Sequence, residues 1–293
     1  MKQFDRSEED IGNSVLLEHV NLRVPDQQLA TLFYVSGLGL TRDPYLMSGL
    51  ENMWMNVGRN QFHLPRGQAQ ILRGRTGLVI EDRGALLQRL AAVRQGLSET
   101  RFDYAEHADH VDVTCPWGNR FRCHVPDLER FGAVLLGIAY VELDVAPGTS
   151  RGIVQFYRQA LRVRADACDD KTGLSARVQI GRWQHLVFRE TERPIAAYDG
   201  HHLQIYLNDF SGPHRWLLER GLISEESSQH QYRFKDIIDP EDGRQLHVVE
   251  HEVRSMTHPL FGRPLINRNP VQNNRAYSPG YDAAQVLMGR DWH

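Results

Sequence analysis

A strand-like segment followed by a helical pattern occurs four times along the 293 residues of the chain. The four strand-like segments begin at Leu16, Thr76, Gly137 and His201. Their starts are 60, 61 and 64 residues apart, and each helical pattern is followed by a hairpin-like run with glycine in its turn. A regular period with one order of elements indicates repeated supersecondary units. The sequence therefore predicts an α+β fold of four βαβββ modules.

Composition excludes several classes of protein. The formal net charge is -3, so the chain lacks the basic character that nucleic-acid binding requires. Its longest apolar stretch, residues 131–141, is far shorter than the roughly 18 residues of a membrane-spanning helix. The N-terminal segment has no apolar signal-peptide core, and the three cysteines form no CxxC motif. We therefore expect a cytoplasmic protein that binds neither nucleic acids nor membranes.

Several short motifs carry a family resemblance. LEHVNLRV and FYVSGLGL look like an opening strand and helix, and WMNVGRNQFHL looks like a closing hairpin. CPWGNRFRC and DPEDGRQLHVV resemble the turn before the last strand of a module. Together these motifs resemble the vicinal oxygen chelate superfamily, which includes glyoxalases, bleomycin resistance proteins and extradiol dioxygenases. The resemblance implies that the four modules pair into two vicinal-oxygen-chelate domains with cupped mixed sheets.

The resemblance also implies an order for the domains. We expect an N-terminal module pair over residues 15–130 and a C-terminal module pair, with a metal site, over residues 131–255. Residues 256–293 contain four prolines and little periodicity, which predicts an extended C-terminal arm. The family pairs modules either within a chain or across a dimer, so a homodimer or a higher homo-oligomer stays open.

Strand alternation indicates which side chains enter the two cups. His202 begins a segment in which polar and apolar residues alternate, and its side chain is expected in the C-terminal cup. The N-terminal cup would contain His19 and His63, with Gly77 and Arg122 in the two remaining positions. Arg122 cannot ligate a metal, and its permanent charge repels a cation. We therefore expect the metal in the C-terminal cup.

The resemblance implies that His202 and His185 are metal ligands in the C-terminal cup. The last ligand position is filled by His247 or by Glu250, depending on whether a bulge shifts the alternation of the strand. Glu142 faces the same cup and is a further anionic candidate. Imidazoles combined with a carboxylate suit divalent Fe, Mn, Zn, Co or Ni. The resemblance to extradiol enzymes favours Fe(II).

The expected activity follows from the same resemblance. His230 precedes the last turn, where the resemblance implies an acid–base histidine, and Tyr140 and Tyr206 offer hydroxyl groups to a substrate. We expect an Fe(II)-dependent dioxygenase that cleaves a catechol-like ring or acts on another small molecule with vicinal oxygens. Two alternatives remain open at this point. One is a glyoxalase-type lyase or isomerase, and the other is a non-catalytic protein that binds a small molecule such as a drug.

Overall fold

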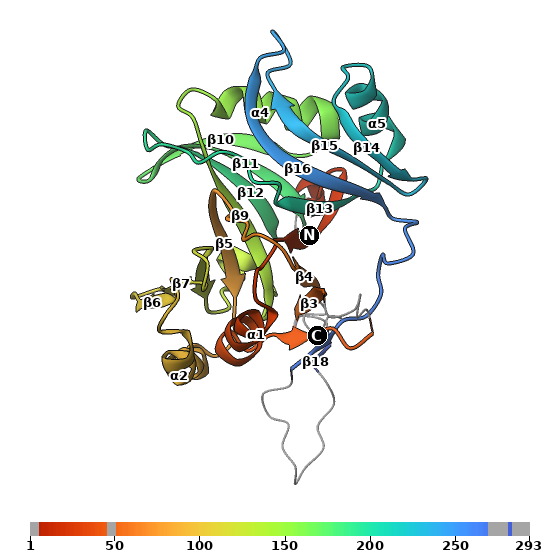
Figure 1. Ribbon diagram of the computed structural model, residues 1–293. Coiled ribbons are helices and arrows are strands. Elements are labelled where there is room, and N and C mark those ends of the chain that lie inside the picture. The colour runs from red at the N-terminus through yellow and green to blue at the C-terminus, as the bar shows by residue number, and fades with distance from the viewer. Residues whose placement is uncertain (1–5, 46–50, 269–280, 283–293) are drawn as a thin grey trace, which may run out of the picture.

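The four predicted modules are present in a computed structural model that describes residues 6–45, 51–268 and 281–282. Their strands form two eight-stranded mixed sheets, and the longer helices pack between the two sheets (Figure 1). The four expected hairpins occur with glycine at or next to the turn, at Gly58, Gly118, Gly181 and Gly243. The repeat in the sequence is therefore a repeat in the structure.

The first sheet has the strand order β14-β15-β16-β13-β1-β4-β3-β2. At its centre β1 runs antiparallel to β13, and each of these strands is parallel to its outer neighbour, β4 and β16 respectively. Its strands are β1 (Ser14–Asn21), β2 (Thr41–Arg42), β3 (Asn52–Val57), β4 (Asn60–Pro65), β13 (His202–Leu207), β14 (Ile223–Ser228), β15 (Gln231–Ile238) and β16 (Gln245–Ser255).

The second sheet has the equivalent order β10-β11-β12-β9-β5-β8-β7-β6, with the antiparallel pair β5 and β9 at its centre. Its strands are β5 (Gly74–Val79), β6 (Asp103–Glu106), β7 (His110–Thr114), β8 (Arg120–His124), β9 (Gly137–Val145), β10 (Ala165–Asp170), β11 (Gly173–Gly181) and β12 (Gln184–Glu190).

The pairing of the modules differs from the pairing that we expected. The first module joins the fourth, and the second joins the third, so neither residues 15–130 nor residues 131–255 form a sheet of their own. Each module offers its first strand as the edge that meets a partner module. The polar and apolar alternation fixes which face of a strand is buried, but it does not fix which of four similar edges meet. The expectation of sequential pairing was wrong for this reason.

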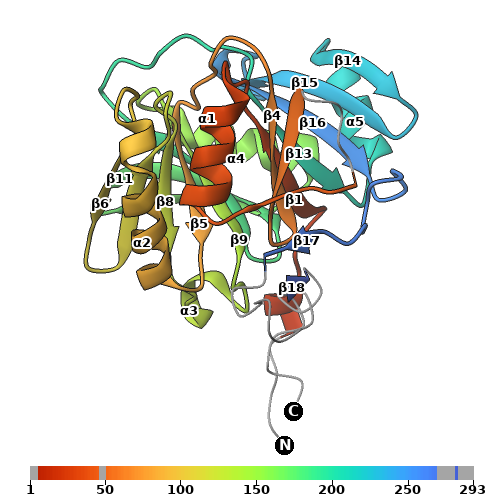
Figure 2. The same cartoon turned by 60° about the horizontal axis from the view of Figure 1, so that its bottom comes forward.

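One helical segment per module covers the face of its sheet that is turned toward the other sheet. Figure 2 shows α1 and α2 side by side, and a Cβ added to Gly37 would lie 3.3 Å from Cγ2 of Val93, so the small residue permits this close approach. None of the helices in the described ranges is long and apolar enough to cross a membrane. The main helices are α1 (Gln27–Thr31), continued by a π-helical turn (Leu32–Gly37), α2 (Arg83–Val93), α3 (Leu128–Phe131), α4 (Ser150–Phe156), continued by a π-helical turn (Tyr157–Leu161), and α5 (Ser211–Leu218).

Apolar side chains of both sheets join in one continuous core in the described part of the chain. The alternation predicted for β13 is confirmed, because Leu203, Ile205 and Leu207 are fully buried on the helix side. Burying each of these side chains contributes about 1.5–3 kcal/mol of hydrophobic free energy. The opposite face of β13, with His202, Gln204 and Tyr206, therefore lines the cup.

The start of the predicted C-terminal arm, residues 256–268, leaves β16 and runs to the far edge of the first sheet (Figure 1). Its Phe261 ring packs on the Tyr206 ring, with centroids 4.9 Å apart. Nη2 of Arg263 lies 2.7 Å from Oδ2 of Asp43, and Asn56 donates to the Ile266 carbonyl at 2.8 Å. Through these contacts the arm crosses the first cup and is bound to the sheet on its far side. Most of the rest of the arm lies outside the described residues.

Candidate metal centre

Polar residues form a row across the centre of the first sheet. The strand register places Glu252 on β16 beside Gln204 on β13, Gln204 beside His19 on β1, and His19 beside Gln61 on β4. Neighbouring side chains in such a row project on the same face and lie within contact distance of one another. His202 lies two residues before Gln204 and therefore projects from the same face.

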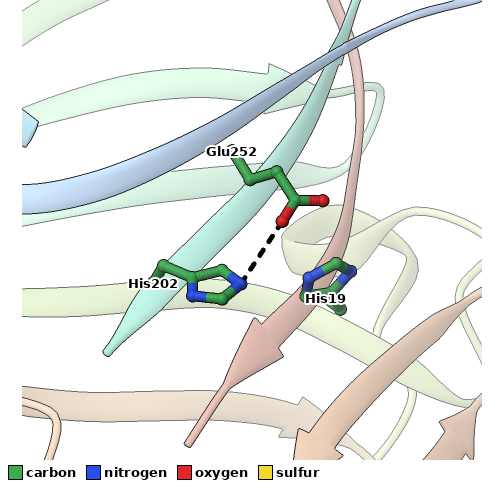
Figure 3. Close-up of side chains that lie close together, drawn as sticks. All are labelled: His19, His202 and Glu252. Carbon is green, nitrogen blue, oxygen red and sulfur yellow. Dashed lines mark ion pairs between the residues drawn. The ribbon is translucent and has the colours of Figure 1, made fainter. Parts of the chain in front are cut away.

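Three of these side chains bring possible metal ligands together. Ligating atoms of His19, His202 and Glu252 all lie within 4.8 Å of one another (Figure 3). Nε2 of His202 is 3.5 Å from Oε2 of Glu252. His19 and Glu252 are buried, and His202 is only slightly exposed. Adjacent strands β1, β13 and β16 each supply one member of the cluster.

The Nε2 atom of His19 has no hydrogen-bond partner in the described part of the chain, although it is fully buried. The other ring nitrogen, Nδ1, lies 3.2 Å from Oε2 of Glu18. The same oxygen accepts from Nη1 of Arg254 at 3.1 Å, so it is the acceptor for an Nδ1–H group of His19. This tautomer leaves the Nε2 lone pair directed at the cluster, which is the state that a metal ligand requires.

Two arginines hold the carboxylate of Glu252. Nη2 of Arg254 lies 2.6 Å from Oε1, and Arg233 forms an ion pair with Oε2. A carboxylate offers about four lone-pair positions, so two ion pairs leave capacity for a further interaction. Ligating carboxylates are commonly held by hydrogen bonds from neighbouring residues. The two arginines therefore orient Glu252 without excluding it as a ligand.

A stack of aromatic rings supports the cluster from one side. The rings of His19 and His63 are stacked with centroids 3.7 Å apart, and Trp54 stacks on His63 at 3.9 Å. Nε2 of His63 is 3.0 Å from Oε1 of Gln61, which fixes the plane of that ring. The stack restricts the orientation of His19.

Burial keeps the imidazoles of the cluster neutral. It lowers the pKa of His202 to about 3, and nearby Arg233 and Arg254 act in the same direction. Burial also lowers the pKa of His19 well below its usual value, helped by the neighbouring His63. Neutral imidazoles have the free lone pair that a metal binds. At neutral pH both rings can therefore act as ligands.

The donor set fits a divalent transition metal. Two imidazole nitrogens and one carboxylate form the combination that non-haem iron(II) enzymes use, with further coordination positions left open. The unpartnered Nε2 of His19 supports this assignment, because a buried polar atom without a partner costs about 1–3 kcal/mol. His19, His202 and Glu252 are thus the residues that could hold a metal.

Comparisons with known proteins agree with this architecture. No protein-family model matches the chain, and no curated protein sequence matches it. Among solved structures, a provisionally assigned dioxygenase from Bacillus subtilis subsp. subtilis str. 168 aligns with 84% of this chain and 86% of its own length, at 12% identity and a TM-score of 0.56. Glyoxalase I from Zea mays aligns with 82% of this chain and 92% of its own length, at 13% identity and a TM-score of 0.55.

The chain has the vicinal oxygen chelate fold. At these identities the likeness establishes the fold and leaves the reaction open, because one fold supports many activities. Each sheet of this vicinal oxygen chelate fold forms its own cup. Each metal ligand that the sequence predicted can therefore be assigned to the first or the second cup.

The expected ligands His202 and His185 are not brought together. His202 lies in the first cup with His19, whereas His185 lies on β12 in the second sheet. The expectation that they share one site was wrong because it depended on sequential pairing of the modules. His19, which we assigned to a different cup from His202, is in fact its partner. His63 lies behind His19 in the aromatic stack.

The last ligand position also differs from the expectation. Glu250 is paired with Arg233 at 2.6 Å and lies 3.6 Å from Nδ1 of His202, outside the three-residue cluster. Nε2 of His247 is 3.3 Å from Nη2 of Arg73, and its ring contacts Phe188 rather than the cluster. Glu252, which the sequence analysis did not single out, provides the carboxylate.

A signal for Glu252 exists in the sequence. Glu250, Glu252 and Arg254 alternate with buried His251 and Val253, so the polar face of β16 continues beyond Glu250. The strand is 11 residues long. The predicted ligand Glu250 is the first acid of this face, whereas the register with β13 selects the second, Glu252.

The predicted catalytic groups are spread over the molecule. The Tyr206 hydroxyl is buried in the first cup and donates to Oε1 of Glu18 at 3.4 Å. The Tyr140 hydroxyl lies in the second cup, 3.0 Å from Nε2 of His124. His230 occupies a turn, where Nδ1 is 3.2 Å from the Thr257 hydroxyl.

The second cup contains a cavity of about 440 Å³ lined by residues that include Tyr140, Glu142 and His185. Glu142 is bound by Arg75 at 2.9 Å and lies 3.8 Å from Arg189. Burial lowers the pKa of His185 to about 4, with a further contribution from Arg177. Within the described residues, a second group of possible ligands with the same spacing, His107, His110 and Asp112, lies at the outer strand β7 of this sheet. It is more exposed than the first group, and its Asp112 is paired with Arg122.

Proposed function

We propose that the chain is a metal-dependent enzyme whose divalent ion is held by His19, His202 and Glu252 in the first cup. The observation that carries the proposal is the convergence of three ligating atoms within 4.8 Å, one of them a buried nitrogen without a partner. Two histidines and one carboxylate favour Fe(II). An extradiol-type dioxygenase acting on a catechol-like or other vicinal-oxygen small molecule is the activity that this donor set supports best.

The residues around the cluster have distinct roles in this proposal. A bound divalent metal would supply positive charge that lowers the pKa of a coordinated hydroxyl and stabilises negative charge on neighbouring oxygens. Arg233 and Arg254 hold the ligand carboxylate in place, and Glu18 fixes the tautomer of His19. The Tyr206 hydroxyl offers a hydrogen bond within the same cup.

The arm contributes by limiting access of water. Phe261 covers Tyr206, and Arg263 is fixed to Asp43 at the far edge of the sheet. Charged groups interact more strongly where water is excluded. A substrate bound beneath the arm would therefore experience the charges of the cup more strongly than it would at an open surface.

Metal analysis tests the location of the centre. Protein purified without chelator is compared with the His202→Ala and Glu252→Gln variants, and metal content is measured by elemental analysis. We expect a metal affinity at least about 10–100-fold lower in both variants, since changes outside the ligand set already cost this much. His185→Ala is the matched control, because it removes a half-buried strand histidine from the other cup. Equal metal content in all four proteins would refute the proposed centre.

Oxygen uptake then tests the reaction. Metal-free protein is loaded anaerobically with Fe(II) and mixed with a panel of catechols before oxygen is admitted. Uptake that requires His202 supports ring cleavage. Retained iron without uptake would reject the dioxygenase and leave a lyase or isomerase at the same centre.

A further inference from the structure

Gln204 occupies the middle of the polar row and has no hydrogen-bond partner for either atom of its amide group within the described residues. The residue is fully buried on β13. A buried amide that makes no hydrogen bond loses its interactions with water and gains nothing in return, which costs about 1–3 kcal/mol for each polar group. A native structure retains such a group only when something else meets its hydrogen-bonding capacity.

The other buried glutamines show how unusual this side chain is. Nε2 of Gln61 donates to Asp43 at 3.0 Å and to Asn56 at 2.6 Å, and its Oε1 is 3.0 Å from His63. Gln184 is bonded through both amide atoms as well. The protein therefore satisfies buried amides elsewhere, including one in the same row of the same sheet.

The position of Gln204 indicates what its amide faces. Its two cross-strand neighbours are His19 and Glu252, which are two of the three proposed ligands. His202, the third, is two residues away on the same face of β13. An amide with one acceptor and two donor hydrogens thus lies next to the proposed metal centre.

We propose that Gln204 is a specificity-determining residue that hydrogen-bonds to the small molecule bound in the first cup. The proposal rests on the proposed function of that cup. The amide is a neutral group with both donor and acceptor capacity, so it recognises an oxygen that accepts from its NH₂ group, or a hydroxyl that also donates to its carbonyl. Oxygenated small molecules with a hydroxyl beside a second oxygen meet this requirement, and purely apolar ligands do not.

The Gln204→Met variant tests the proposal, because it keeps the side-chain volume and removes the amide. A glutamine that only supports the fold loses stability on this change, whereas an amide without a protein partner does not. We therefore expect the midpoint of thermal unfolding of the metal-free variant to be equal to or above that of the wild type. Gln61→Met is the matched control, and loss of its three hydrogen bonds is expected to lower the midpoint by at least about 2 °C.

Binding provides the second measurement. Wild type and Gln204→Met are loaded with Zn²⁺, which is redox-inert, and titrated with 4-nitrocatechol by absorbance. We expect equal Zn²⁺ affinity and a roughly 5- to 100-fold weaker affinity for 4-nitrocatechol in the variant, the loss that an unpaired polar group causes.

The possible failures can be distinguished. Equal affinity of both proteins for 4-nitrocatechol, or a lowered midpoint for Gln204→Met, would overturn the role of Gln204 while leaving the metal centre intact. A lower Zn²⁺ affinity in the variant would overturn it too, because the amide would then be a ligand. Zn²⁺ binding by the wild type without binding of 4-nitrocatechol would reject both the proposed substrate class and the role of Gln204.

Discussion

Replacing Arg263 by methionine should destabilise the protein far more than replacing an exposed arginine. The side chain of Asp43 is 1% exposed, and its Oδ2 lies 2.7 Å from Nη2 of Arg263. Removing one partner of a buried ion pair typically costs about 3–5 kcal/mol, because the other charge stays buried without its counter-ion. Gln61 and the backbone N–H of Tyr45 also donate to Asp43, so we expect a value near the lower limit, about 3 kcal/mol.

The reverse replacement, Asp43→Asn, should cost less. Arg263 retains some exposure to water, and an asparagine can still accept a hydrogen bond from it. We expect about 1–2 kcal/mol for this variant. In the double variant neither charge is left uncompensated, so its loss should be smaller than the sum of the two single losses by at least about 1 kcal/mol.

Equilibrium unfolding in urea measures the three losses, and an exposed pair provides the control. Arg66 and Glu51 are 3.4 Å apart, with more than half of each side chain exposed. Arg66→Met should cost no more than about 1 kcal/mol. Additive losses in the cycle, or a loss for Arg263→Met as small as that for Arg66→Met, would show that the contact does not fasten the arm.

Two further predictions concern a close backbone contact and the response to acid. Gly58 and Gly221 both have a φ of +66°, but a Cβ at Gly58 would lie 1.9 Å from the Leu136 carbonyl oxygen, whereas nothing lies within 4 Å at Gly221. Gly58→Ala should therefore cost at least about 2 kcal/mol more than Gly221→Ala in urea unfolding, and equal costs would contradict the contact. Burial lowers the pKa of His185 to about 4 and that of His247 to about 3, so the folded state binds fewer protons than the unfolded state between these values and the usual 6.5. Stability should be complete above pH 6.5 and fall as the pH decreases toward 4, by up to about 1.4 kcal/mol per pH unit for each ring, and His185→Gln should flatten this slope when unfolding is measured across the range.

The fold could be predicted from the sequence because its signals are local. The period of the modules, the glycine turns and the alternation of β13 are each contained within a short stretch of chain. Module pairing is not local, since it depends on which first-strand edges meet. β1 pairs with β13 although residues 22–201 lie between them, and no motif within either strand encodes this choice.

The candidate site could be anticipated only in part for the same reason. The family resemblance of its strand implied that His202 is a ligand, and the structure places it in the candidate cluster. Its partners His19 and Glu252 depend on the register between three strands that are distant in sequence. Gln204 could not be recognised at all from the sequence, because a glutamine on a polar face is ordinary until its neighbours are known. Only the register and the lack of a hydrogen-bond partner in the described part of the chain distinguish it from Gln61.

The two cups differ at their central strand pair, and in the described part of the chain only the first cup has a cluster of possible ligands there. In the second cup the row through Tyr140 continues to Gly77 and then to Arg122. A Cβ at Gly77 would lie 2.2 Å from the Tyr140 ring, so this ring occupies the space that a side chain on β5 would need. Arg122, which cannot ligate a metal, takes the next position and forms a bidentate ion pair with Asp112. The equivalent central pair in the first cup brings His19 beside Gln204. The fold therefore provides the same scaffold twice, and the residues of the central strand pair decide whether that part of the cup can bind a cation.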